Sequence, residues 1–225
     1  VAIRHVTVFS EQEVGHQLES LGANLLVLPK DASLQDYYAA DLSGRTLPES
    51  HVASILIANL SGVERLSPRL CTTTKILDRD VTLTGILPQS EFAKKAVWQS
   101  VGLFSNKHVG CKKAAHGPKT YDGAPEELST ARSIDQLQGN EAVIGADIAE
   151  FAKLKAGSGV VLFGHQLQVI AVLPRTGTID DTRVFAHLHT VQKMMNAGEV
   201  VNAIEVMGCC EDAAGNLVPS LAELL

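Results

Sequence analysis

Hydrophobic and polar residues alternate along several short stretches of the chain, as they do in strands that bury one face. The pattern is clearest at 80–88 (DVTLTGILP), and 182–188 (TRVFAHL) is predicted to be another strand. Two further alternating runs, 159–164 and 165–173, follow each other directly and predict a hairpin that turns around Gly164–His165. The second half of the chain is therefore expected to be dominated by antiparallel strands.

Apolar and β-branched residues predict four more strands, at 24–29, 63–77, 141–145 and 200–208. The first of these is a compact apolar run, which favours a buried strand. Pro68 lies within the second and predicts a bend or a strand edge, because proline has no N–H to donate. The same strand is expected to pair with 80–88 as a hairpin across residues 78–80.

Helical periodicity and capping residues predict helices between these strands. Ser10 caps the first, with Glu13 at the capping-box position, and Gly198 is expected to end the one at 189–198. The predicted helices span 10–21, 49–60, 90–101, 146–154, 189–198 and 212–225, and a short helix is expected within the loop 30–48. Up to residue 88 the order suggests a β-α-β unit with helices on one face, and the fold class expected for the whole chain is α+β.

Residues 105–140 do not follow either periodicity. The segment is polar, contains Gly, Pro and Lys, and shows little apolar patterning. It is therefore predicted to be a long surface insertion.

The composition is that of a globular protein. The chain has 225 residues, of which 45% are hydrophobic and 20% charged, enough for one large domain or two small ones. The net charge of −6 argues against non-specific nucleic-acid binding, which needs a basic face. No run reaches the roughly 18 apolar residues of a membrane span. Because the chain starts without Met and ends within a predicted helix, it is expected to be a fragment of a longer protein.

Two adjacent aspartates, Asp180 and Asp181, are candidates for a carboxylate pair in acid–base or metal chemistry. However, neighbours in an extended chain point to opposite faces, and no nearby His or Glu is spaced to join both. The alternative is a turn, in which Gly177 supplies a positive φ and a carboxylate caps local N–H groups. The turn is the favoured interpretation.

His187 and His189 are two positions apart, so on a strand both would face one side. A two-histidine metal site is one interpretation. No carboxylate or third histidine follows at short range, which favours a structural pair at a strand end near a helix start. Phosphate-binding loops and a G-x-S-x-G nucleophile motif are missing from the sequence.

Residues 141–195 contain an ordered set of short motifs, which are Ile144–Gly145, Ala149, Leu154–Lys155, Gly157, Val169, Val172–Leu173, Thr176–Gly177, Asp180–Asp181 and Thr190. This ordered set resembles the periplasmic core domain of MacB/FtsX/LolC-type ABC transporter permeases. Upstream, 21–30 (LGANLLVLPK) is similar to the first strand of that family and 61–70 (SGVERLSPRL) to its G-V-x-x-x-S-P step. The chain departs from the family at the 105–140 insertion, at Cys209–Cys210, and where AGSG replaces Gly-Asp.

The resemblance implies a non-catalytic domain on the extracytoplasmic side of the cell inner membrane. It implies a porter-like α/β sandwich subdomain, formed by 1–88 and 191–225, and an inserted mostly-β Sabre-like subdomain at 89–190. The implied partners are the chain's own transmembrane helices, a cytoplasmic ABC ATPase that uses the ATP, a second permease copy, and a periplasmic or outer-membrane protein. No cofactor is implied within the domain, no nucleic acid is expected, and the cargo is left open among lipoproteins, lipids, peptides and peptidoglycan-hydrolase control.

Cysteines and histidines form the remaining group of candidate functional residues. His108, Cys111 and His116 lie within one predicted loop, and Cys209–Cys210 ends a predicted strand. Thiolate and imidazole ligands suit zinc or copper, which would make the chain a free-standing periplasmic metal-binding protein. An extracytoplasmic location equally permits a disulfide from Cys111 to Cys209 or Cys210, and free thiols are the third alternative. Cys71 is predicted to be a buried free thiol. A hydrolase that uses Asp180 or Asp181 is a further, weaker alternative.

Overall fold

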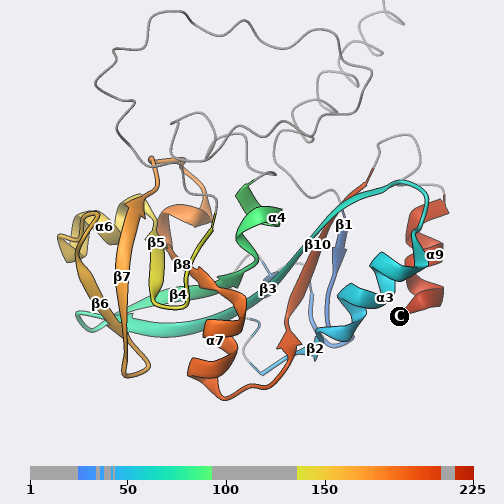
Figure 1. The fold of residues 1–225 in the computed structure, drawn as a ribbon, viewed down its shortest axis with the longest axis horizontal. Coiled ribbons are helices and arrows are strands. Elements are labelled where there is room, and N and C mark those ends of the chain that lie inside the picture. Colours follow the sequence, from blue (N-terminus) through green and yellow to red (C-terminus); the bar gives the residue numbers. More distant parts are fainter. Residues whose placement is uncertain (1–24, 34–35, 38–41, 43, 93–135, 209–215) are drawn as a thin grey trace, which may run out of the picture.

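The computed structural model describes residues 25–33, 36–37, 42, 44–92, 136–208 and 216–225 (Figure 1). Its elements, in chain order, are β1 (Leu25–Val27), β2 (Leu47–Pro48), α3 (Ser50–Ala58), β3 (Val63–Ile76), β4 (Arg79–Ile86), α4 (Pro88–Phe92), β5 (Glu141–Ile144), α6 (Ala146–Ala152), β6 (Gly159–Leu162), β7 (His165–Val172), the 3-10 helix η2 (Ile179–Thr182), β8 (Arg183–His187), α7 (Leu188–Met195), β9 (Val200–Val201), β10 (Ala203–Gly208) and α9 (Val218–Leu224).

Eight strands form one mixed sheet in the order β1-β10-β3-β4-β8-β5-β7-β6, and β2 and β9 form a small second sheet. The pairs β4–β8 and β5–β7 are parallel, and the other pairs of the large sheet are antiparallel. The predicted α+β class is confirmed. Within the described part, no helix is both long and apolar enough to cross a membrane.

The predicted β-α-β unit is present, with one strand placed between its two strands. β1 and β3 run parallel, and β10, from near the end of the chain, lies between them and pairs antiparallel with both. β1 is an edge strand whose three residues are only half-buried. The predicted strand at 24–29 is present in shortened form, but it is partly and not fully buried, because a run of apolar residues does not reveal that a strand has a neighbour on one side only.

Both predicted hairpins form, and each turns one residue earlier than predicted. The turns are Leu77–Asp78, with φ of 48° and 62°, and Phe163–Gly164, with φ of 49° and 76°. A two-residue turn with both φ values positive matches the twist of the flanking strands, so the strands pair up to the turn. Asn-Gly is the usual sequence in such a turn. The bulky Leu77 and Phe163 are atypical at these positions, so the sequence did not indicate where the turns begin.

The predicted strand at 200–208 is wrong as a single element. It divides into β9 and β10, which belong to different sheets. Asn202 lies between them, and its side chain accepts from the backbone N–H of Cys71 at 2.9 Å and donates to the carbonyl of Cys71 at 2.7 Å. Pro68 lies at an edge, as predicted, because β3 pairs with β10 there while its pairing with β4 begins at Arg69.

The predicted helices at 49–60 and 146–154 are confirmed as α3 and α6, and that at 212–225 corresponds in its described part to α9. α7 ends at Met195, before the predicted Gly198, because Asn196 takes up the left-handed conformation that closes the helix. Of the predicted helix at 90–101 the structure describes only residues up to Phe92, within α4, and the one at 10–21 lies outside the described residues. In the predicted loop 30–48 the structure describes β2 and a helical turn at Asp36–Tyr37.

The two faces of the large sheet differ in chemistry. Residues opposite each other on neighbouring strands share a face, and one face packs against α3, α7 and α9. Leu70, Leu83 and Val184 are completely buried there. We call it the helical face. The opposite face, called the Arg69 face, carries Arg69, Cys71, Thr84, Phe185 and Arg183.

One residue near the end of the predicted insertion, Leu137, belongs to the core. Leu137 is buried on the Arg69 face against Ile86, Val143 and Phe185. The predicted surface position is therefore wrong for Leu137, because a single apolar residue in a polar run gives no periodicity, whereas residues 136 and 138–140 are exposed as expected. Residues 105–135 lie outside the described part of the chain.

Candidate functional site

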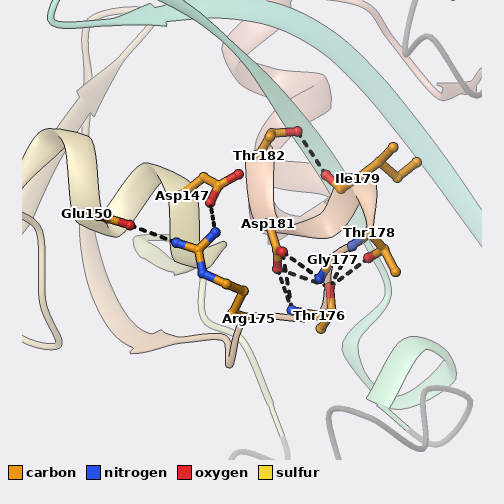
Figure 2. A network of polar contacts seen from close by, with 9 residues as sticks. All are labelled: Asp147, Glu150, Arg175, Thr176, Gly177, Thr178, Ile179, Asp181 and Thr182. Atoms are coloured by element: carbon orange, nitrogen blue, oxygen red, sulfur yellow. Dashed lines mark hydrogen bonds and ion pairs between the residues drawn. The ribbon is translucent and has the colours of Figure 1, made fainter.

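Arg175 joins the loop before η2 to α6. Its guanidinium pairs with the carboxylate of Asp147 and, through Nη2, with that of Glu150 at 2.7 Å (Figure 2). The hydrogen bond with Asp147 and its negative charge raise the pKa of Arg175 above its ordinary value. The three side chains are exposed, so this pairing orients the loop and contributes little to stability.

Asp181 closes the same loop. Its carboxylate accepts from the backbone N–H of Thr176 at 2.9 Å, from the N–H of Gly177 at 2.8 Å and from the Thr176 hydroxyl at 3.0 Å (Figure 2). Gly177 has a φ of 71°, which glycine adopts without strain. This is the predicted turn, and its hydrogen bonds occupy the lone pairs that a metal ion or a substrate proton would need.

Asp180 is also buried, but it acts elsewhere. Its N–H donates to the hydroxyl of Thr178 at 3.3 Å, and its negative charge acts on Arg69. The backbone of η2 lies so close to Gly145 that a Cβ added there would come within 2.2 Å of the Asp180 carbonyl oxygen. Gly145 therefore permits α6 and η2 to pack together. The two aspartates do not share one site.

His187 caps α7. Its Nδ1 accepts from the backbone N–H of His189 at 3.3 Å, and the two rings meet edge to face with centroids 5.2 Å apart. Burial lowers the pKa of His187, and the nearby charges of His189 and Lys193 lower it further, whereas Glu49 opposes them. A cap needs the neutral, accepting form of the ring, so this environment suits the role.

His189 contacts a carboxylate that is distant in sequence. Its Nε2 lies 3.1 Å from Oε1 of Glu49, while Oε2 of Glu49 accepts from Nε2 of Gln192 at 2.7 Å. Gln192 also donates to the carbonyl of Val200 at 3.0 Å, so the network links α7 to the start of α3 and to β9. Among the residues that the structure describes, no group of three or more His, Cys, Asp or Glu side chains could hold a metal ion.

A groove of about 750 Å³ lies beside this network, between α3 and α7. One wall is polar and comes from α7, and the other is small or apolar and comes from α3. Leu56 and the neighbouring Ile57 on α3 are 63% and 83% exposed. The lining residues that define the two walls are Val52, Ala53, Leu56, Gln192, Lys193 and Asn196.

Of the four cysteines, the structure describes Cys71. It is 2% exposed and free, with its Sγ 3.7 Å from the Thr84 hydroxyl, which confirms the predicted buried thiol. The metal and disulfide candidates, His108, Cys111, His116, Cys209 and Cys210, all lie outside the described residues. Those predictions stay predictions, and no geometry of the described residues favours the metal-binding alternative.

A buried ionic cluster on the Arg69 face was not predicted from the sequence. The guanidinium of Arg69 pairs with Glu91 of α4 and, at 3.0 Å, with Glu205 of β10, which also accepts from the Tyr37 hydroxyl. Burial opposes the charge on Arg69, but the carboxylates of Glu205 and Glu91 outweigh it and hold its pKa well above the ordinary value. Strand alternation could have shown that Arg69 and Cys71 share a face, but not which carboxylates approach them.

Comparison with known proteins gives a likeness in structure. No family model matches the chain, and no curated protein matches it. The fold is similar to the periplasmic region of MacB from Actinobacillus actinomycetemcomitans, with a TM-score of 0.50 and 16% identity over 88% of this chain and 80% of that one. The extracellular domain of the noncanonic ABC-type transporter YknZ from Gram-positive bacteria also matches, with a TM-score of 0.47 and 16% identity over 84% of both chains. The predicted resemblance to a MacB-like periplasmic domain is confirmed at the level of the fold.

Proposed function

We propose that this chain is the extracytoplasmic domain of an ABC transporter permease of the MacB/FtsX/LolC group and is itself non-catalytic. The observation that carries the proposal is the fold likeness to the periplasmic region of MacB, which extends over 88% of the chain. The ordered motifs of the sequence point the same way. The buried Asp181 carboxylate supports the non-catalytic part, since its hydrogen bonds serve the turn.

The architecture suits a part that transmits movement. β3 has 14 residues and is therefore about 46 Å long at 3.3 Å per residue. It pairs with β10 at its start and with β4 over its remaining length, and the β3–β4 turn lies at the opposite end of the molecule from the C-terminus (Figure 1). β3 curves along this path but is hydrogen-bonded to β10 or β4 along its length, so a displacement at one end would reach the other (Figure 1).

In the proposed arrangement the domain lies outside the inner membrane, joined to the chain's own transmembrane helices. A cytoplasmic ABC ATPase hydrolyses ATP, and the resulting movement acts on a cargo or a partner outside. A second permease copy and a periplasmic or outer-membrane protein complete the assembly.

The proposed domain has a porter-like part (1–88 and 191–225) and a Sabre-like part (89–190), and one sheet joins the two parts. β4 of the first part pairs in parallel with β8 of the second. Because one sheet crosses the proposed boundary, we expect the two parts to move together.

The test uses the complete permease with its ATPase in lipid nanodiscs. Spin labels on unnatural amino acids at Ile57 and Leu77, which are 83% and 72% exposed, avoid the native cysteines. With an ATP analogue, the distance between the two labels of one chain should stay constant, while the distance between equivalent labels in two copies should change.

A nucleotide-dependent change within one chain would contradict the rigid transmission, and no change in either distance would contradict the coupling. The location is tested separately, with an azide-bearing residue at Leu77 and a membrane-impermeant dye. Labelling of intact spheroplasts is expected. Labelling only after lysis would exclude an extracytoplasmic domain.

A further inference from the structure

Arg183, the first residue of β8, is buried without a hydrogen-bond partner. Its side chain is on the Arg69 face, since Arg183 lies opposite Thr82 of β4 in the parallel pair. Arg183 is 1% exposed. In the part of the chain that the structure describes, none of its three guanidinium nitrogens has a hydrogen-bond partner. Arg175, in the preceding loop, is by contrast exposed and paired twice.

Arg69 also has one buried nitrogen without a hydrogen-bond partner among the described residues. Its terminal nitrogens bind Glu91 and Glu205, but its buried Nε has no partner among the described residues. Arg69 and Arg183 lie on the same face on either side of β4, where Arg69 is opposite Ile86 and Arg183 is opposite Thr82, four residues earlier. The small side chain of Thr84 lies at the β4 position midway between them, and Cys71 and Phe185 flank it on the neighbouring strands, all three buried. Between them the two guanidinium groups present four buried nitrogens without a partner.

The charges of both arginines act on the same neighbouring phenol. Burial raises the pKa of the Tyr37 phenol, and the positive charges of both Arg69 and Arg183 act against this rise. Both guanidinium groups are therefore close enough to the Tyr37 hydroxyl to influence it. Asp180, three residues before Arg183, does not hydrogen-bond that guanidinium, and its charge acts on Arg69.

A guanidinium cannot relieve its burial by losing its proton, because arginine stays charged in proteins. Leaving such a cation buried and unpaired is strongly unfavourable, and its planar fork of N–H groups matches the two oxygens of a carboxylate or a phosphate. We propose that Arg183, together with Nε of Arg69, binds one small oxyanion, a carboxylate or phosphate group, enclosed against the Arg69 face. Because Arg183 is almost completely buried, the anion is small and exchanges slowly.

The first experiment measures what the purified protein retains. The complete chain is desalted into chloride buffer and denatured, and the released phosphate and organic acids are quantified by ion chromatography. About one anion per chain is expected. The protein is then refolded without added oxyanion and titrated with inorganic phosphate or with acetate, against sodium chloride at equal ionic strength. A melting temperature that rises with the logarithm of the oxyanion concentration is expected, and the more effective titrant identifies the chemical class.

Substitutions of Arg183 test whether the oxyanion-dependent rise in melting temperature comes from binding at this residue. Arg183→Met should abolish the oxyanion-dependent rise, and in chloride alone it should melt at or above the wild-type temperature, because an unpaired buried charge has been removed. Arg175→Met is the matched control at an exposed arginine and should keep the full rise. Arg183→Lys retains the positive charge but loses the planar guanidinium, so it should keep a smaller oxyanion-dependent rise in melting temperature. This variant also tests the site if Arg183→Met does not fold.

Three outcomes would overturn the proposal. A released anion with an unchanged rise in Arg183→Met would mean an adventitious ion only. No released anion and no oxyanion-dependent rise in the wild type would exclude the site. A loss of stability in Arg183→Met that is the same with and without oxyanion would show that the chain itself supplies the partner. The proposed transport function does not depend on any of these results.

Discussion

Asp181 illustrates how a carboxylate that looks catalytic in sequence serves the backbone in the fold. It is 3% exposed and accepts from the N–H groups of two consecutive residues, Thr176 and Gly177. Hydrogen bonds from backbone N–H to a charged acceptor contribute more than neutral ones, and removing a buried acceptor leaves its donors unsatisfied. The turn therefore depends on this one side chain.

We predict that Asp181→Ala lowers the free energy of unfolding by about 2 kcal/mol. The matched control is Asp147→Ala, which removes an exposed carboxylate that pairs with Arg175 in the same region. Its loss is expected to be below about 0.5 kcal/mol, because exposed ion pairs contribute little. Urea unfolding followed by circular dichroism measures both. Equal losses would show that the buried hydrogen bonds are not what holds the turn.

His187 makes the stability of α7 depend on pH. Its pKa is lowered from the ordinary 6.5, chiefly by burial, so the unfolded chain binds the proton more readily than the folded one. Stability is therefore fully present above pH 6.5 and declines as the pH falls through the folded pKa. Protonation also removes the Nδ1 lone pair that accepts from His189.

The predicted result is a melting temperature that falls between pH 7 and pH 5, with a smaller fall in His187→Asn. Asparagine can cap a helix without titrating. His165→Asn is the control, because His165 is exposed on β7, and it should leave the pH dependence unchanged. An identical fall in His187→Asn and the wild type would assign the effect to other groups, of which Glu49, His189 and Lys193 are the nearest.

At the scale of the elements, the two hairpins have strands that the sequence predicted and turn residues that rarely adopt the conformation found. Leu77 and Phe163 both have a positive φ, at 48° and 49°, and they expose 72% and 43% of their surface. A bulky residue in this conformation is strained, by about 1 kcal/mol or more. The flanking strands nevertheless pair up to the turn. The hairpins form because their strands bury alternate side chains in the core, and not because of their turn residues.

Replacing Phe163 by Asn creates Asn-Gly, the preferred sequence for a two-residue turn with positive φ values. We expect Phe163→Asn to raise the free energy of unfolding by about 1 kcal/mol, and Leu77→Asn combined with Asp78→Gly to act similarly. Val161→Asn is the control, since it removes an exposed apolar side chain from β6 without changing the turn, and it should be neutral or destabilising. Thermal melts distinguish the cases. A destabilising Phe163→Asn would mean that the aromatic side chain contributes more than the turn strain.

Elements that depend on the pattern of neighbouring residues could be predicted from the sequence, and elements that depend on contacts with distant segments could not. α3, α6 and both hairpins follow from periodicity within a few residues. The division between β9 and β10 depends on Asn202, whose hydrogen bonds reach Cys71, 131 residues away along the chain. Similarly, apolar residues predicted a strand at 24–29 but could not show that β1 lies at the edge of the sheet.

For the whole molecule, the continuous sheet predicts cooperative behaviour. The central strands β3, β4 and β8 connect the two proposed subdomains through main-chain hydrogen bonds. We expect a single unfolding transition, with equal free energies of opening for the amides of β4 and β8 in native-state hydrogen exchange. Mass spectrometry across a urea series measures both strands at once. Two separated transitions would show that the proposed subdomains are independent folding units.

The sequence by itself determined the α+β class, most of the strands and helices, the turn around Asp181 and the resemblance to MacB-like domains. These features follow from alternation, capping and short motifs, which act over a few residues. Only the tertiary structure decided the strand order, the pairing of His189 with Glu49, 140 positions away, and the burial of Arg69 and Arg183 on one face. The physical reason is that burial and ionic pairing depend on which distant segments the packed sheet brings together, and no local pattern of side chains carries that information.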